Sequence, residues 1–329
     1  MIPTRLHRGI DVGVLGMGCA QLGNLGSAMT DEEAEATVHA AWDVGIRHFD
    51  TAPHYGLGLS ERRLGRALAA YPRDEYIVST KVGRLLVPSP ETAHERDLAN
   101  LFDVPSDHRR VYDLSRDGVR RSIDASLQRL GLDRVDIVYM HDPDDHAEAA
   151  RTTGAQALAE LRDAGVIRGF GAGMNQAGML ADLIEQTDVD IVMCAGRLTL
   201  LEQASSRRML EAARERGVAV VAAAVYNSGL LARDTVPDRV TYDYVHAPTD
   251  IVERARDIER ICRAHGVSLP AAALQFPLRL PQVVSSVVGL RGPRQVEEAA
   301  ARIAVEIPEA LWTALADAGH IVAMASIQD

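Results

Sequence analysis

Short apolar runs rich in β-branched residues recur along the 329-residue chain. Each run is continuously apolar and does not alternate with polar residues, as expected of parallel strands that are covered on both faces. The pattern predicts eight strands, over residues 12–18, 45–52, 76–83, 134–142, 166–175, 189–196, 218–229 and 283–290.

Amphipathic segments with the period of a helix separate these runs. The first, TDEEAEATVHAAWDVG, begins with a Thr/Asp cap at Thr30, continues with an acidic first turn and ends at Gly45, all of which are typical of a helix. Later segments follow the same logic and close on glycine before the next run: SRDGVRRSIDASLQRLGL, ALAELRDAGV, SRRMLEAARERGV and TDIVERARDIERICRAHGV.

This alternation of eight strands with about eight helices predicts an α/β fold, a (β/α)8 TIM barrel that forms one domain over residues 1–329. An open, doubly wound parallel sheet is the alternative. The segment GVLGMGCAQLG after the first run lacks the G-x-G-x-x-G spacing and no helix opens directly on it. A bound dinucleotide would therefore not be held as in a Rossmann domain.

Composition and charge exclude several classes of function. The formal net charge of −11 is spread without long basic runs, which argues against a nucleic-acid or anionic-membrane partner. No segment approaches the roughly 18 to 20 apolar residues of a membrane span or resembles a signal peptide, so we expect a cytoplasmic protein. Cys19, Cys194 and Cys262 are odd in number and far apart, so we expect neither a disulfide framework nor a metal site.

Basic residues show an unusual bias, because Lys81 is the single lysine among 35 Lys and Arg residues. Arginine cannot replace lysine where the chemistry requires a compact or deprotonatable amine. The bias therefore marks Lys81 as a candidate functional residue.

Four titratable residues follow the predicted strands in a regular way. Asp50 ends the second strand, Lys81 the third and His141 the fourth, and Tyr55 lies in the loop after the second. In a barrel of this kind the carboxyl ends of the strands face the active site, so these side chains should converge.

The four side chains suit proton transfer to or from an alcohol or carbonyl oxygen. A tyrosine with an ordinary pKa of about 10 exchanges protons poorly near neutrality unless a cation such as Lys81 eases its ionisation. Asp50 can balance the buried ammonium, and His141 can hold the substrate oxygen near the phenol. Proton transfer of this kind accompanies hydride transfer.

The chain also resembles a known family over roughly residues 9 to 302. The segments DTAPHYGLGLSERRLG, STKVGR, DIVYMHDPD, GAGMN, YNSGLL and VVGLRGPRQVEEA resemble, in order and spacing, the aldo-keto reductase superfamily. Within it they are most similar to the branch that contains D-threo-aldose 1-dehydrogenase (L-fucose or galactose dehydrogenase) and pyridoxal 4-dehydrogenase. The resemblance implies a TIM barrel that transfers hydride between a nicotinamide cofactor and a small sugar hemiacetal, alcohol or aldehyde.

The resemblance also implies roles for individual residues. Tyr55 would be the general acid/base, Lys81 and Asp50 would tune its pKa, and His141 would orient the substrate oxygen. The cofactor would lie extended over the barrel mouth. It would be bound by Gly18, Asn175, Tyr226, Asn227, Ser228, Gly229, Leu231, Gly289, Arg291, Gln295 and Glu298. Asn175 would hold the carboxamide of the nicotinamide, and the segment around Ser228 and Gly229 would wrap the pyrophosphate.

The sequence departs from the family pattern at two places that concern the cofactor. Leu198 replaces an expected tyrosine, and the usual stacking aromatic maps to the alanines 222–224, which leaves Tyr226 as a substitute or the ring less tightly held. Where NADPH-preferring relatives have an arginine, this chain has Gln295, which favours NAD over NADP, although Arg291 and Arg294 are near enough in sequence to supply charge.

Two long connections, at about residues 84–113 and 232–250, should cover the catalytic face and shape the substrate site. The second offers Tyr242, Tyr244 and His246, and the aromatic content of 4% favours a polar pocket for a sugar, a polyol, a pyridoxal-like compound or a simple aldehyde. Two alternatives remain open from the sequence: a lyase that forms a Schiff base on Lys81, and a non-catalytic, cofactor-sensing barrel. The sequence does not determine the oligomeric state.

Overall fold

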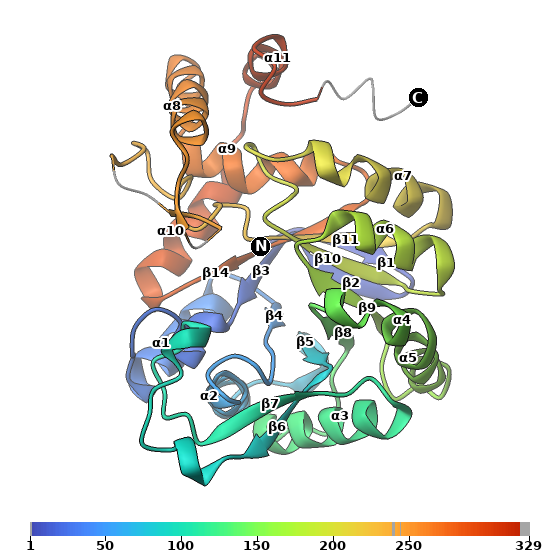
Figure 1. Ribbon diagram of the computed structural model, residues 1–329. Coiled ribbons are helices and arrows are strands. Elements are labelled where there is room, and N and C mark those ends of the chain that lie inside the picture. The colour runs from blue at the N-terminus through green and yellow to red at the C-terminus, as the bar shows by residue number, and fades with distance from the viewer. Residues whose placement is uncertain (1, 239–240, 244, 323–329) are drawn as a thin grey trace.

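A computed structural model describes residues 2–238, 241–243 and 245–322 of the chain. Its centre is a closed barrel of parallel strands, and helices cover the outside (Figure 1). Around the barrel the strands are β3 (Leu15–Gly18), β4 (His48–Asp50), β5 (Ile77–Val82), β8 (Ile137–His141), β9 (Gly169–Met174), β10 (Ile191–Ala195), β11 (Ala219–Ala223) and β14 (Val283–Gly289). The predicted (β/α)8 barrel is confirmed, and the open doubly wound sheet is wrong because β14 pairs with β3 and closes the sheet.

Each predicted run contains one strand of the barrel and extends beyond it, and in two of the runs the extra residues form a different structure. The run over residues 12–18 is divided, because residues up to Gly13 pair in an antiparallel hairpin formed by β1 (Thr4–His7) and β2 (Ile10–Gly13). Ile10 and Val12 of this hairpin pack against residues inside the barrel, including Ile137 and Ile191. The run over residues 218–229 stops at Ala223 and continues as turns.

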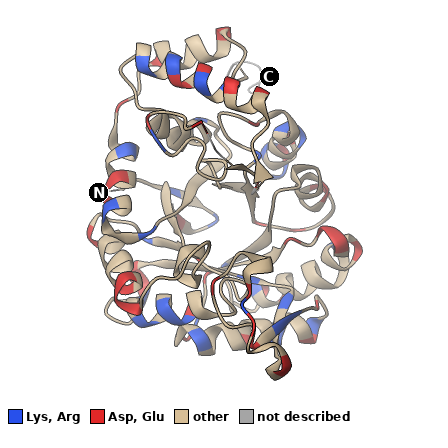
Figure 2. Ribbon diagram, turned by 60° about the vertical axis from the view of Figure 1, so that its left-hand side comes forward, with Lys and Arg blue, Asp and Glu red and all other residues tan. Residues whose placement is uncertain are grey.

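The helices form the outer layer of the barrel. They are α1 (Asp31–Asp43), α2 (Leu59–Leu68), α3 (Arg116–Leu130), α4 (Ala147–Ala149), α5 (Ala155–Asp163), α6 (Ala177–Gln186), α7 (Arg207–Arg216), α8 (Thr249–Ala264), α9 (Leu269–Gln275), α10 (Gly292–Ala304) and α11 (Glu309–Asp317). The predicted cap of α1 is present, since Thr30 and Glu33 bond to each other's backbone N–H in a capping box. Charged residues lie mainly on these helices and on the loops (Figure 2).

The connection predicted at residues 84–113 contains a second unpredicted hairpin. Its strands are β6 (Arg84–Pro88) and β7 (His108–Tyr112), which pair antiparallel. Turns between them carry Phe102 to an isolated bridge with Leu25. The connection at 232–250 holds the short pair β12 (Thr241–Tyr242) and β13 (Val245–His246), whereas residues 239, 240 and 244, including Tyr244, lie outside the described part of the chain.

Candidate active site

The neighbouring strands β5 and β4 place Lys81 and its partner Asp50 at the mouth of the barrel. The Lys81 ammonium donates to the Asp50 carboxylate at 2.6 Å and to the carbonyl oxygen of Thr51 at 3.0 Å, and both charged side chains are buried. The other Asp50 oxygen accepts from the Ser79 hydroxyl at 2.7 Å. Although burial opposes the charge, the Asp50 carboxylate and Tyr55 hold the pKa of Lys81 above its usual value. The amine is therefore a fixed cation.

Tyr55 lies directly beside this cation. The Lys81 nitrogen is 4.8 Å from the centre of the Tyr55 ring, and the ring is only partly buried. Burial raises the pKa of the Tyr55 phenol to about 12, and the Lys81 ammonium opposes that rise. Tyr55 is therefore protonated at neutral pH, next to the group that stabilises its phenolate.

His141 ends β8 and meets Tyr55 edge to face, with 5.7 Å between ring centres. Burial, with a contribution from Lys81, holds the pKa of His141 well below its usual value, so the ring is neutral. Its Nε2 atom lies 3.6 Å from the Asp142 carboxylate, which favours a proton on that nitrogen. Asp50, Tyr55, Lys81 and His141 thus converge as predicted from their positions at strand ends.

A second histidine, His54, lies in the same cluster, although its role was not predicted. Its ring is 5.4 Å from that of His141 and 5.2 Å from that of Phe102, both edge to face. Burial, reinforced by Arg110 and Arg84, lowers the pKa of His54 to about 2. His54 therefore adds a neutral imidazole to the site.

The hairpin β6–β7 forms a wall beside these residues. Arg84 binds Asp142 at 2.8 Å, Tyr112 donates to the carbonyl oxygen of His141 at 3.3 Å, and Arg110 donates to that of His54 at 3.0 Å. Sequence reasoning placed a substrate wall here but did not identify these contacts. The sequence did contain a signal for the contact with Asp142, because this residue directly follows the strand-end His141 in the motif HDPD.

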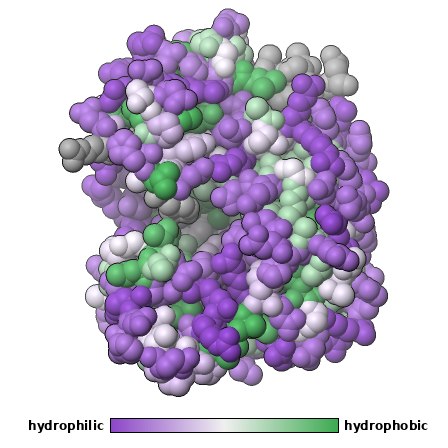
Figure 3. Space-filling model, viewed as in Figure 1, coloured by the Kyte–Doolittle hydropathy of each residue, from purple (hydrophilic) through white to green (hydrophobic). Residues whose placement is uncertain are grey.

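A cleft of about 680 Å³ lies beyond the carboxyl ends of β11 and β14. Among its lining residues are Tyr226, Ser228, Gly229, Gly289, Gln295 and Glu298, all of which were predicted to bind the cofactor. Sequence reasoning did not assign Arg233 and Arg302, which also line the cleft. This side of the molecule is hollowed near its centre (Figure 3).

The other residues predicted to bind the cofactor lie elsewhere. Gly18 ends β3 between Asp50 and Gly289, and Asn175 is exposed directly after β9. Leu231 is fully buried in a core cluster that includes α8, and Asn227 is buried with its amide on the carbonyl oxygen of Gly196. Both residues occupy the predicted loop, but their side chains serve packing, so contact with a cofactor would come from the backbone.

The Arg291 side chain makes its hydrogen bonds within the protein. Its guanidinium binds the Ser27 hydroxyl at 2.7 Å and the carbonyl oxygens of Ser27 and Ala28. Gln295 accepts from the Arg291 backbone N–H at 2.9 Å. Arg291 thus fastens the loop after β3 to the end of β14.

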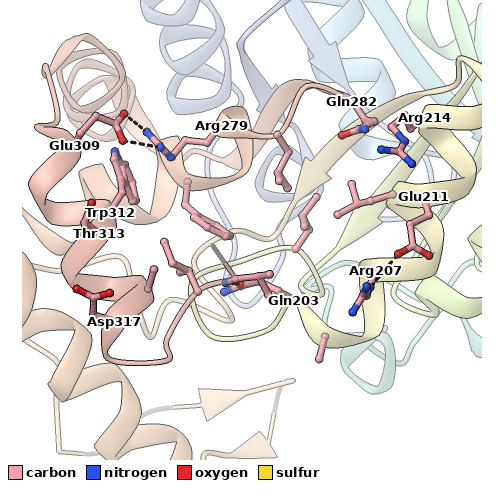
Figure 4. Close-up of a pocket in the computed structure, with 18 of the residues that line it drawn as sticks. Gln203, Arg207, Glu211, Arg214, Arg279, Gln282, Glu309, Trp312, Thr313 and Asp317 are labelled. Carbon is pink, nitrogen blue, oxygen red and sulfur yellow. Dashed lines mark hydrogen bonds and ion pairs between the residues drawn. The ribbon is translucent and has the colours of Figure 1, made fainter. Parts of the chain in front are cut away.

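Another groove, of about 780 Å³, lies on the flank of the barrel between α7 and α11 (Figure 4). Trp312 and Phe276 supply apolar lining, and Arg279 pairs with Glu309 across one end. None of the four catalytic candidates lines this groove. This groove is therefore separate from the candidate active site.

Residues 2–238, 241–243 and 245–322 contain no group of three or more His, Cys, Asp or Glu side chains arranged to hold a metal. In the same ranges no helix is both long and apolar enough to cross a bilayer. The three cysteines are buried and unpaired.

Comparison with known proteins identifies the family. The model of the Aldo/keto reductase family matches residues 14–319. The chain belongs to the aldo/keto reductase family. This aldo/keto reductase is 46% identical to a D-threo-aldose 1-dehydrogenase from Pseudomonas sp, over 96% of its own length and 97% of the relative's. It is 39% identical to a pyridoxal 4-dehydrogenase from Microbacterium luteolum, over 95% and 96% of the two chains.

Solved structures agree on the fold. The aldo/keto reductase superposes on the holo form of an aldo-keto reductase from Bacillus halodurans with a TM-score of 0.75, at 22% identity and 96% coverage of both chains. It matches a glycerol dehydrogenase from Gluconobacter oxydans equally well, with a TM-score of 0.75, 24% identity and coverage of 98% and 95%. The family makes this protein an NAD(P)-dependent oxidoreductase. The alternative of a cofactor-sensing barrel without activity is therefore set aside.

The structure also argues against a lyase that forms a Schiff base on Lys81. A Schiff base forms from a neutral amine. The Lys81 nitrogen is a buried ammonium held 2.6 Å from the Asp50 carboxylate, and its pKa is raised. This lysine is arranged to remain charged.

Proposed function

We propose that the protein is an aldose 1-dehydrogenase-like enzyme that oxidises the hemiacetal of a sugar to a lactone, or a comparable alcohol to a carbonyl compound. The observation that carries the proposal is the contact of Tyr55 with the buried Lys81–Asp50 pair beside a neutral His141. The similarity to a D-threo-aldose 1-dehydrogenase supports the substrate class.

In this proposal side chains of the protein transfer the proton, and the cofactor would carry the hydride. A nicotinamide cofactor, when bound, would supply the hydride acceptor for oxidation and the hydride donor for reduction. Tyr55 takes the hydroxyl proton during oxidation and gives it back to the carbonyl oxygen during reduction. The Lys81 ammonium stabilises the phenolate form, and Nε2–H of His141 donates a hydrogen bond to the reacting oxygen.

The cleft at β11 and β14 fits the extended cofactor. Asn227, Ser228 and Gly229 adopt positive φ values of 45°, 56° and 91°, so the chain turns sharply beside the cleft, and the N–H groups of Asn227 and Gly229 donate to the carbonyl oxygens of Ala224 and Tyr226. Ser228 and Gly229 are exposed in the cleft, where this turn would lie beside the pyrophosphate. Gly289, opposite them, would lie along the adenosine half.

We further propose that NAD is preferred over NADP. Glu298 in the cleft pairs with Arg294 at 3.5 Å and with Arg302 at 3.3 Å, so it neutralises the cations that a 2′-phosphate would need. Arg291 is engaged by the Ser27–Ala28 loop. A ribose 2′-hydroxyl can donate a hydrogen bond to the Glu298 carboxylate, whereas a phosphate would be repelled by it.

A substrate panel tests both proposals. Purified protein is mixed with aldoses, polyols, pyridoxal and simple aldehydes, each with NAD(H) and with NADP(H), and the absorbance of the reduced nicotinamide is followed. We expect the highest kcat/KM for an aldose with NAD. Preference for NADP would overturn the cofactor proposal, and turnover of aldehydes without any aldose or alcohol oxidation would overturn the substrate class.

A further inference from the structure

Asp142, the residue after His141, has an unusual backbone. Its φ is +43°, in the left-handed region that non-glycine residues rarely occupy. Its N–H donates to the carbonyl oxygen of Gly173 at the end of β9, at 3.1 Å. Such strain costs about 1–3 kcal/mol and persists where the surrounding structure imposes it, often at functional sites. The strained backbone of Asp142 places its carboxylate beside His141.

The Asp142 side chain is held but not enclosed. Its Oδ2 accepts from Arg84 of the β6–β7 wall at 2.8 Å and lies 3.6 Å from Nε2 of His141. Within the described part of the chain, its Oδ1 accepts no hydrogen bond. The side chains of Asp142 and Arg84 remain 34% and 25% exposed. The pair therefore offers hydrogen-bonding capacity directly beside the position of the reacting oxygen.

Neighbouring side chains fix the geometry of this pair. Tyr112 holds the carbonyl oxygen of His141 at 3.3 Å, and its ring stacks on His146 at 3.9 Å. Arg84 starts the strand β6 that carries it, and β6 is paired with β7 along its length. These contacts favour the orientation in which the Asp142 carboxylate lies beside His141.

The chemistry of the pair matches a hydroxyl next to the reacting carbon. If the reacting oxygen binds Nε2 of His141, a hydroxyl on the neighbouring carbon comes within reach of the Asp142 carboxylate, which lies 3.6 Å from that nitrogen and can accept the hydroxyl proton. A substrate that has hydrogen in place of this hydroxyl cannot donate a hydrogen bond to the Asp142 carboxylate. A site built to bind a hydroxyl discriminates strongly against such a substrate.

Resting on the proposed function, we propose that Asp142, held by Arg84, is a specificity-determining residue that binds the hydroxyl on the carbon adjacent to the reacting carbon. It makes the enzyme select 2-hydroxylated, aldose-like substrates over 2-deoxyaldoses and simple aldehydes. This assigns the substrate choice to one strained residue and one arginine of the wall, not to the catalytic four.

The test compares the best aldose of the panel with its 2-deoxy counterpart. For the wild type we expect a kcat/KM ratio of at least tenfold in favour of the aldose, roughly the value of a lost hydrogen bond to a charged group. Asp142→Ala should bring the ratio to within about threefold, and Asp142→Asn, which keeps an acceptor oxygen, should lie between. Asp144→Asn is the matched control, because Asp144 lies on the same loop and binds Gln176 instead of Arg84.

The outcomes separate the possible explanations. Arg84→Gln, which releases Asp142 but keeps its charge, should also lower the ratio, and this variant provides the test if the Asp142 variants do not fold. An unchanged ratio, or equal losses for both sugars, would overturn the proposal and leave Asp142 a purely structural role. If the wild type reduces aldehydes but accepts no aldose, the proposed specificity is wrong while oxidoreductase activity stands. If no substrate is turned over at all, the proposed function fails first.

Discussion

Two buried ion pairs lie on opposite sides of the same strand, and they serve different purposes. Lys81 of β5 points into the barrel mouth and pairs with Asp50 at 2.6 Å. Its neighbour Thr80 points outward and donates at 2.8 Å to Glu61 of α2, which pairs with Arg129 of α3 at 2.5 Å. Successive residues of a strand face opposite sides, so one position separates the two environments.

The difference between the pairs lies in what else they touch. Glu61 is completely buried and all of its contacts belong to the layer between barrel and helices. The inner pair has a third member, since Lys81 lies 4.8 Å from the ring of the partly exposed Tyr55. Burial and ion pairing alone therefore do not mark a catalytic group. The proposed role of Tyr55 in proton transfer is what would make the inner pair catalytic.

Of the changes to the two ion pairs, removal of the inner cation should have the larger effect on turnover. Lys81→Met keeps most of the side-chain volume but leaves the phenol of Tyr55 without its stabilising charge. We expect turnover to fall by about 10³-fold, within the usual contribution of proton transfer catalysis. Steady-state kinetics with the best panel substrate measure the loss. Turnover within tenfold of the wild type would show that the inner pair, like the outer one, is structural.

The outer pair should respond in the opposite way. Glu61→Gln leaves Arg129 and Thr80 without a charged partner, and breaking a buried pair costs about 3 kcal/mol of unfolding free energy. Well below the unfolding midpoint, turnover should stay within about threefold, because Glu61 contacts none of the catalytic side chains. Urea titration and kinetics on the same sample separate the two effects. A large loss of turnover in fully folded protein would contradict the distinction.

A smaller effect should appear with pH, because the inner network extends to a buried histidine. His48 contacts Ser79 at 3.3 Å, and Ser79 binds Asp50. Burial lowers the pKa of His48 to about 4, whereas an unfolded histidine titrates near 6.5. The unfolded chain therefore takes up a proton first as the pH falls, and the stabilisation present above pH 6.5 is lost.

The expected loss from this histidine is about 2 kcal/mol of unfolding free energy at pH 5 relative to pH 7. Urea titrations at the two pH values measure it, with His48→Gln as the comparison. The variant should show a shallower pH dependence by this amount. An identical dependence in both proteins would show that other groups cause the acid destabilisation.

The sequence predicted the barrel and the four inner residues for clear physical reasons. Continuous apolar runs mark strands covered on both faces, and polar residues at their carboxyl ends must meet at one mouth. The single lysine identified the cation. The family resemblance supplied the roles of Tyr55 and His141, which spacing alone left open.

Other parts of the structure depend on contacts between residues far apart in the chain. The segment SERRLG predicts the start of a helix. Nothing near it in the sequence indicates that Glu61 is buried against Arg129, which is 68 positions away. The β6–β7 hairpin is mixed in polarity because it covers a polar site. The left-handed turn at Asp142 has no signature in the residue type, since the surrounding structure imposes it.

The most direct test of the account is the substitution Tyr55→Phe, with turnover and cofactor binding measured on the same protein. The change removes one hydroxyl from a ring that remains packed against Phe102 and His141. We predict a fall in kcat of about 10³- to 10⁴-fold, as expected for loss of the acid/base group, with a Kd for NAD within about threefold of the wild type. Turnover close to that of the wild type would contradict the central claim that Tyr55 carries the proton.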